Sequence, residues 1–262
     1  MKANTNGIDT HYTIDGDGPW LVFSHSLACN VSMWGPQVEA FSKGYKVLCY
    51  DTRGHGQSSA PAGAYTLEQL ADDAKALLDT LGIKSCHWVG LSMGGMIGQT
   101  FALKYPGIFK TMTLADTTSR YPPELQSAWQ GRIDIASEQG MEPISELMLE
   151  RWFTEPYRKG GAPVIASIAQ GIRSTPVAGF VGCCHAIPKI NVSARLKDVK
   201  CPALVIVGEQ DPGTPVSMAR EIHENLPGSE LVIIPSAAHL SNLEQPTAFN
   251  TALASFLDRN RG

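Results

Sequence analysis

The sequence predicts an α/β protein with a mostly parallel sheet, helices on both faces and a helical segment inserted between two strands. Short, fully apolar runs alternate with runs of helical period along most of the 262 residues. Strands that are apolar along their whole length are typical of parallel sheets buried on both faces. The alternation stops between residues 117 and 198, where only helical patterns occur.

Seven segments are expected to form strands. Residues 10–15 alternate Tyr12 and Ile14 with polar residues and end in a Gly-Asp-Gly-Pro turn, which favours a half-buried strand. The other six are short apolar runs at residues 20–24, 45–50, 86–90, 111–115, 203–207 and 231–234.

Helices are expected between these strands. Residues 66–81 carry apolar side chains at helical spacing, and Gly82 is placed to end that helix. Residues 93–105 follow a strand and stop before Pro106. The last two expected helices cover residues 216–225 and 246–258.

The region without apolar strands is expected to be a separate unit. We predict a core domain of residues 1–116 and 199–262 and a helical lid of residues 117–198. The helices expected in the lid cover residues 124–139, 143–152, 163–174 and 178–186.

Composition excludes several classes of function. The net charge is −4 and no Lys/Arg-rich run occurs, which argues against a nucleic-acid partner. No apolar run approaches the ~18 residues that a membrane helix needs, and the polar start lacks the apolar stretch of a signal peptide. We therefore expect a cytoplasmic protein that binds neither nucleic acid nor membrane.

The six cysteines are scattered and are expected to be free thiols. Cys183 and Cys184 are adjacent, but no second pair of ligands stands at a spacing suited to zinc. No metal site is therefore expected.

Gly90-Leu91-Ser92-Met93-Gly94 is a G-x-S-x-G pattern between an expected strand and an expected helix. A sharp turn at this place lifts a serine hydroxyl above the carboxyl end of a parallel sheet, where ligands bind. Small neighbours leave room for the strained turn, and the helix start favours a developing anion. A plain strand–helix turn is the alternative, although the G-x-G-x-x-G pattern of a dinucleotide site is missing.

A serine nucleophile needs a base and an orienting carboxylate. Among seven histidines, His239 stands in a loop after the last apolar strand, and Asp211 follows the strand at residues 203–207. Asp116, after residues 111–115, competes with Asp211 for the acid role.

An oxyanion needs two N–H donors. We expect them from the backbone of Met93 and of Leu27, with Ser26 as the nearest alternative to Leu27, and expect His25 to shape that loop. Asp51, a third candidate acid, and Arg53 are expected to brace the same loop by hydrogen bonds.

The chain resembles the α/β-hydrolase family along nearly its whole length. "SHSLACNVSMW", "YDTRGHGQSSAP", "GLSMGGMIGQ", "LVIVGEQDPGTP" and "AAHLSNLEQP" occur in the family's order. The resemblance implies an eight-stranded sheet, a lid, no metal or organic cofactor, and a Ser92–Asp211–His239 triad in the family's chain order. It also implies Leu27 and Met93 as the oxyanion donors.

Within the family, "YDTRGHGQS", "LSMGG" and "RWFT" are most similar to the 3-oxoadipate enol-lactonases. That likeness implies hydrolysis of this enol-lactone in aromatic-compound (β-ketoadipate) degradation. The oxyanion loop reads His-Ser-Leu-Ala at residues 25–28 where that subgroup has Asn-Ser-Leu-Gly, which leaves the substrate open. The alternatives are a general carboxylesterase or neutral-lactone hydrolase, a carbon–carbon bond hydrolase, and a non-catalytic receptor.

The partner is expected to be a small lactone or ester, and the lid is expected to select it. An enol-lactone of a dicarboxylic acid carries a free carboxylate, so a cation should face the site. Arg132, three residues after Trp129, is the candidate, with Ser26, Trp129 and Trp152 as further substrate-binding residues. Most other lid aromatics are expected to be lid core.

Overall fold

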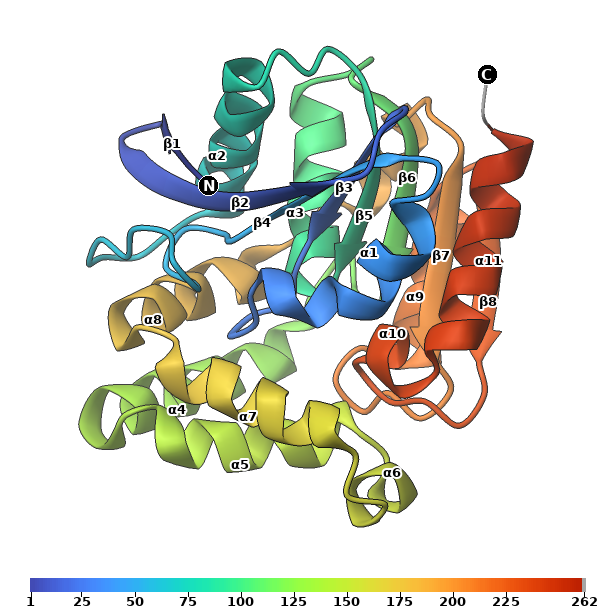
Figure 1. Ribbon diagram of the computed structural model, residues 1–262. Helices are drawn as coiled ribbons and strands as arrows, with labels where there is room; N and C mark the ends of the chain where they lie inside the picture. Colours follow the sequence, from blue (N-terminus) through green and yellow to red (C-terminus); the bar gives the residue numbers. More distant parts are fainter. Residues whose placement is uncertain (261–262) are drawn as a thin grey trace.

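The computed structural model describes residues 1–260 and contains an eight-stranded sheet of order β1-β2-β4-β3-β5-β6-β7-β8 (Figure 1). The pairs β1–β2 and β2–β4 are antiparallel, and every other pair is parallel. The strands are β1 (Lys2–Thr5), β2 (Ile8–Asp15), β3 (Trp20–Ser24), β4 (Lys46–Tyr50), β5 (Cys86–Leu91), β6 (Phe109–Ala115), β7 (Ala203–Gly208) and β8 (Glu230–Ile234).

All seven expected strands are present, and the sheet has one more. The additional strand, β1, is polar and mostly exposed, and it pairs with β2 at the edge of the sheet. Its sequence carries no apolar signal, because backbone pairing rather than burial holds it in place. The central strands β5 and β7 are buried at every residue, as their continuous apolar runs predict.

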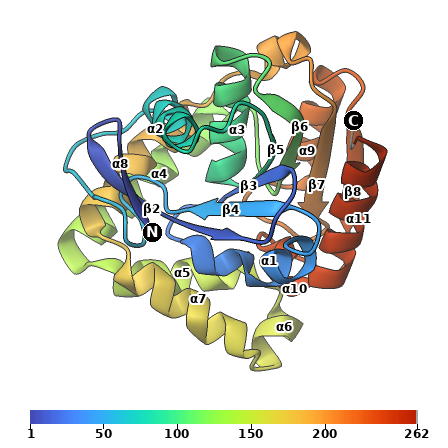
Figure 2. The same ribbon diagram turned by 45° about the horizontal axis from the view of Figure 1, so that its top comes forward.

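Helices cover both faces of the sheet (Figure 2). Helices α2, α3 and α9 pack on one face, while α1 and α11 pack together on the other. The unexpected α1 begins with Gly-Pro, a start that the apolar period alone does not reveal. The helices of the core are α1 (Gly35–Phe41), α2 (Leu67–Thr80), α3 (Met93–Lys104), α9 (Val216–Asn225), α10 (Ser241–Glu244) and α11 (Pro246–Arg259), with the 3-10 turn η1 (Val31–Trp34).

Residues 117–198, which we call the lid segment, form helices that lie together beside the sheet (Figure 1). The four expected lid helices are confirmed within two residues at each end, and the short α6 is additional. An isolated bridge between Arg120 and Asn191 joins the two ends of the segment. The division into two domains stays a prediction. The lid elements are α4 (Pro123–Gln139), α5 (Met141–Trp152), α6 (Glu155–Lys159), α7 (Pro163–Ser174), α8 (Val177–Ala186), η2 (Ile187–Lys189) and η3 (Ser193–Asp198).

Within residues 1–260, no single helix has the length and apolar composition to cross a membrane. One pair of lid helices, residues 163–174 and 177–189, meets the length and composition criteria only when taken together, and the pair is bent by 92°.

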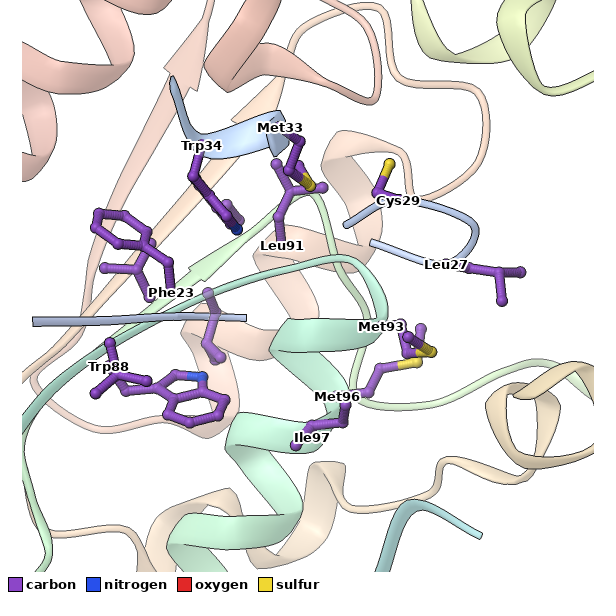
Figure 3. Close-up of a cluster of buried hydrophobic side chains, with 14 of the residues drawn as sticks. Phe23, Leu27, Cys29, Met33, Trp34, Trp88, Leu91, Met93, Met96 and Ile97 are labelled. Atoms are coloured by element: carbon purple, nitrogen blue, oxygen red, sulfur yellow. The ribbon is translucent and has the colours of Figure 1, made fainter. Parts of the chain in front are cut away.

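The turn between β5 and α3 is packed too closely for side chains at its glycines. A Cβ on Gly90 would lie 2.1 Å from the carbonyl oxygen of Gly94, and one on Gly94 would lie 2.0 Å from that of Ser24. Behind the turn, buried side chains from β3, η1, β5 and α3 fill the core (Figure 3). The turn therefore rests on a packed base that cannot shift freely.

Replacing Gly90 by alanine is expected to lower the free energy of unfolding by about 1–3 kcal/mol, because the new methyl group meets backbone atoms. Chemical denaturation of the variant measures this loss. Gly131→Ala is the matched control: a Cβ there meets nothing within 4 Å, and alanine in a helix interior should stabilise by about 0.5–1 kcal/mol. Equal stability of the two variants would contradict the prediction.

Candidate active site

Ser92 occupies a strained turn directly after β5. Its backbone angles are φ 55° and ψ −113°, a conformation that costs a non-glycine residue about 1–3 kcal/mol. The Ser92 N–H donates to the Ala115 carbonyl at 2.8 Å, and the Thr117 hydroxyl donates to the Ser92 carbonyl at 2.7 Å. These two bonds satisfy the polar backbone groups of Ser92 and hold its hydroxyl above the end of the sheet.

The structure brings Ser92, His239 and Asp211 into one hydrogen-bonded chain. The Ser92 hydroxyl lies 2.9 Å from Nε2 of His239, whose Nδ1–H donates to Asp211 Oδ2 at 2.7 Å. The three residues follow β5, β7 and β8, which end at the same edge of the sheet. All three side chains are buried, so the chain is shielded from bulk water.

Hydrogen bonds fix the carboxylate of Asp211. Its Oδ1 accepts from the N–H groups of Gly213 and Thr214 at 2.7 and 3.0 Å, and its Oδ2 accepts from the Thr214 hydroxyl at 2.7 Å. Burial by itself raises the pKa of Asp211, but the His239 charge and these bonds outweigh it, and the net shift is downward. Asp211 therefore stays ionised.

The contact between Asp211 and His239 shifts the pKa of His239 in the opposite direction, upward. Burial by itself lowers the pKa of His239, but the charge and hydrogen bond of Asp211 outweigh it and raise that pKa above its usual 6.5. The imidazole thus becomes a stronger base beside Ser92, as a general base requires.

Asp116, the competing acid, makes no hydrogen bond to His239 among the described residues. Its carboxyl instead accepts from the Gly208 N–H at 2.7 Å and from the Ser241 hydroxyl at 2.6 Å. Burial, with the nearby charge of Asp211, raises the pKa of Asp116 to about 8. Asp116 therefore ties β7 to the loop that carries His239 rather than orienting the imidazole.

The two backbone N–H groups expected to bind an oxyanion have no hydrogen-bond acceptor within residues 1–260. Neither the Leu27 N–H nor the Met93 N–H donates to another group within the described part of the chain. Leu27 lines the pocket, and its buried side chain lies at the border of the hydrophobic cluster drawn in Figure 3. Met93 is the first residue of α3, so its N–H points out of the helix start.

Two neutral histidines hold the loop around Leu27. His25 donates from Nδ1 to the Ser26 carbonyl at 2.7 Å and accepts from the Thr52 N–H at 2.9 Å. His55 accepts from the Ala28 N–H at 2.9 Å. Burial lowers the pKa of His25, and burial with the neighbouring His25 lowers the pKa of His55 to about 3. The expected loop-shaping role of His25 fits this geometry, and His55 is a partner that the sequence did not reveal.

The expected bracing by Arg53 is wrong. Its guanidinium pairs with Asp73 on α2, at 2.6 and 2.7 Å, rather than with the oxyanion loop. Asp51 does reach the end of that loop, because its Oδ1 accepts from the Val31 N–H at 2.8 Å. It also contacts His11 at 2.7 Å. Arg53 pairs with Asp73 because the two carboxylate oxygens of that residue on α2 match the two N–H donors of the guanidinium.

A pocket of about 170 Å³ opens beside the Ser92 hydroxyl, between the core and the lid segment. The four residues expected to bind substrate, Ser26, Trp129, Arg132 and Trp152, all line it. The Ser26 hydroxyl is buried and has no hydrogen-bond partner among the described residues. The remaining lining residues are Leu27, Ser92, Tyr121, Leu125, Ala128, Met148, Arg151, Ile187, Pro212, Gly213, Thr214 and His239.

Arg132 is half-buried at the lid wall of this pocket. Its guanidinium lies 4.3 Å from the centre of the Trp129 ring, and no carboxylate pairs with it in the described residues. Burial lowers its pKa from the usual value, which means that its charge lacks full compensation. Arg151, a second arginine on the pocket wall, was not predicted to bind substrate, although it begins the RWFT stretch that carries the likeness to the enol-lactonases.

Cys183 and Cys184 lie on α8 and are buried. Burial raises the pKa of the Cys184 thiol to about 12, so this group stays protonated. No cluster of three or more His, Cys, Asp or Glu side chains suited to a metal ion occurs in the described residues.

A family model described as the alpha/beta hydrolase fold matches residues 19–246. The chain belongs to the α/β-hydrolase family. This α/β hydrolase is 39% identical to 3-oxoadipate enol-lactonase 2 of Acinetobacter baylyi, over 93% of its own length and 90% of the relative's.

Solved structures give the same family. The α/β hydrolase superposes on the enol-lactonase of Burkholderia xenovorans LB400 with a TM-score of 0.94, at 38% identity, covering 98% of this chain and all of that one. A thermophilic esterase from Thermogutta terrifontis, solved with malate bound, also has a TM-score of 0.94, at 29% identity, covering 100% of this chain and 99% of the other.

The two buried acids are expected to respond differently to amide substitution. Asp211→Asn should lower kcat by about 10⁴-fold, because an amide cannot hold the histidine tautomer. Asp116→Asn should keep kcat within about tenfold, because Asp116 bonds Gly208 and Ser241 and makes no hydrogen bond to His239 among the described residues. Steady-state kinetics on a p-nitrophenyl ester measures both.

The pH profile provides a second readout of the same pair. As pH falls through the raised pKa of His239, the imidazole gains a proton and stops acting as a base, so kcat/KM of the unsubstituted chain should fall with a midpoint above 6.5. Asp211→Asn should move this limb to lower pH, because burial then dominates. If the acidic limb of kcat/KM stayed in place in Asp211→Asn, or if Asp116→Asn lost more kcat than Asp211→Asn, Asp211 would not be the carboxylate that orients His239.

Proposed function

We propose that this α/β hydrolase is a serine hydrolase that cleaves a small lactone or ester through Ser92, His239 and Asp211. The observation that carries the proposal is the continuous chain from Ser92 through His239 to Asp211, at 2.9 and 2.7 Å, on the wall of a pocket. The backbone N–H groups of Leu27 and Met93, which donate to no other group within residues 1–260, support it. The complete chain argues against the non-catalytic receptor, although turnover rather than the alignment itself distinguishes an enzyme from a receptor of this fold.

In the proposed reaction, His239 takes the proton of Ser92 while the serine oxygen attacks the substrate carbonyl. The carbonyl oxygen becomes an oxyanion and accepts hydrogen bonds from the Leu27 and Met93 N–H groups. His239 then gives the proton to the leaving oxygen, and the acyl group stays on Ser92. Water, activated by His239, hydrolyses the acyl-enzyme and restores the serine.

The pocket favours a small, acidic substrate. A volume of about 170 Å³ lies below the roughly 300–1,000 Å³ of sites for drug-sized ligands. Arg132 offers an uncompensated positive charge at the lid wall, suited to a free carboxylate. We therefore propose 3-oxoadipate enol-lactone as the substrate, in aromatic-compound degradation, as the names of the similar enol-lactonases suggest.

A carboxylesterase or neutral-lactone hydrolase is the second candidate. The likeness to the Thermogutta terrifontis esterase favours it, because the same fold at a TM-score of 0.94 is named an esterase there. Both candidates use the same serine chemistry and differ in the charge of the substrate. Nothing in the pocket favours the carbon–carbon bond hydrolase specifically.

Comparison of two substrates tests the proposal. We expect kcat/KM for 3-oxoadipate enol-lactone to exceed that for p-nitrophenyl acetate, since only the lactone offers a carboxylate to Arg132. Ser92→Ala should lower kcat for both by about 10³-fold or more while the circular dichroism spectrum stays unchanged. A folded Ser92→Ala variant that keeps its rate would refute serine catalysis. A preference for the neutral ester would leave the esterase as the function.

Arg132→Ala is expected to raise KM for the acidic lactone by about tenfold to a hundredfold, because a charge-assisted hydrogen bond is lost. KM for p-nitrophenyl acetate should stay unchanged. Arg173→Ala is the matched control, since Arg173 lies on α7, pairs with Glu142 and does not line the pocket. An unchanged KM for the lactone in Arg132→Ala would remove Arg132 from substrate recognition.

A further inference from the structure

The end of α5 packs against the loops that follow β7 and β8. Arg151 donates from Nη2 to the Pro212 carbonyl at 3.0 Å, and the Leu240 N–H donates to the Trp152 carbonyl at 3.1 Å. The Trp152 ring stacks on the His239 ring, with centroids 6.3 Å apart and planes inclined by 29°. The lid segment therefore contacts the loops of the triad through both backbone and side chains.

The carboxylate of Glu244 joins the lid segment to the loop that carries His239. Its Oε2 accepts from the Ala238 N–H at 2.9 Å, one residue before His239. Its Oε1 accepts from the Thr154 N–H at 3.1 Å and from the Thr154 hydroxyl. Thr154 belongs to the lid segment, two residues after α5 ends. One carboxylate thus binds donors from both parts of the molecule.

This carboxylate is buried and has no basic partner. Glu244 is 4% exposed, and no Lys, Arg or His side chain pairs with it in the described part of the chain. A buried anion without a counter-charge depends on its hydrogen-bond donors. The donors of Glu244 come from two segments, so displacement of either segment leaves the anion under-satisfied.

We propose that Glu244 is a positioning residue that aligns His239 toward Ser92 and makes this alignment depend on the seating of the lid segment. The Ala238–Glu244 bond fixes the backbone directly before His239, and the Thr154–Glu244 bonds fix the lid segment to the same oxygen pair. A lid that moves away removes two of the three donors, and the loop before His239 loosens with it. The inference rests on the proposed serine-hydrolase function.

Two variants test the two sides of this connection. Thr154→Val removes the hydroxyl donor of the lid side and leaves the Ala238 bond intact. Glu244→Gln keeps the size of the side chain, but its amide nitrogen cannot accept a hydrogen bond. We expect each variant to lower kcat for p-nitrophenyl acetate by about tenfold with KM unchanged, because neither residue lines the pocket.

The rate at which a small phosphonate labels Ser92 is the decisive readout. Labelling reports how well His239 activates Ser92, so it should fall by the same factor as kcat. The double variant should be no slower than Glu244→Gln alone, because both changes break the same connection. A carboxylate that serves only to stabilise the fold would lower the melting temperature and leave the labelling rate of the folded protein unchanged.

Tyr157→Phe is the matched control. It removes another lid–core hydrogen bond, from the Tyr157 hydroxyl to the Leu243 carbonyl at 3.2 Å, without touching the donors of Glu244. Its labelling rate and kcat should equal those of the unsubstituted chain. An equal loss in Tyr157→Phe would overturn the assignment, since any weakening of the lid contact would then suffice.

Unchanged labelling of Ser92 in folded Thr154→Val and Glu244→Gln would also overturn the positioning role of Glu244. If Glu244→Gln does not fold, Thr154→Val alone decides the test. The failure of the underlying function looks different. An unsubstituted chain that neither turns over ester nor reacts with the phosphonate would refute the serine hydrolase itself. Turnover by the unsubstituted chain with unaffected variants would refute only the role of Glu244.

Discussion

Ser92 stands at φ 55° and ψ −113°, and the surroundings of the site hold this one residue in its strained turn. A non-glycine residue keeps such angles only where its surroundings leave it no alternative. Bonds to Ala115 and Thr117 fix its backbone, and the bare backbones of Gly90 and Gly94 let the turn press against its neighbours. The strained turn places the Ser92 hydroxyl where residues of the loops after β7 and β8 reach it.

The loops around Ser92 are held by buried side chains rather than by surface ion pairs. Each of these side chains accepts a hydrogen bond from a backbone N–H of a neighbouring loop or strand end, which fixes loop positions without side-chain entropy at the surface. Two are histidines kept neutral by burial, and one is a carboxyl, Asp116, whose pKa is raised by burial and a nearby charge. The pairs are His25 with Thr52, His55 with Ala28, Asp116 with Gly208 and Glu244 with Ala238.

The core and the lid segment contribute different properties to the proposed site. The core provides the reactive groups, because the strand ends that carry them lie at one edge of the sheet. The lid segment provides most of the apolar wall and both arginines, and so sets the size and charge of what fits. Specificity can therefore change through the lid segment while the chemistry of the core stays the same.

The sequence by itself determined the order of strands and helices and the residue types of the proposed triad, because apolar periodicity and the G-x-S-x-G turn are local patterns. It missed β1, whose polar residues are held by pairing, and misassigned Arg53, whose partner Asp73 lies on a separate helix. Only the tertiary structure decided which carboxylate meets His239, and that Glu244 binds the lid segment. These contacts join residues far apart in the chain, so packing alone selects among chemically equivalent partners.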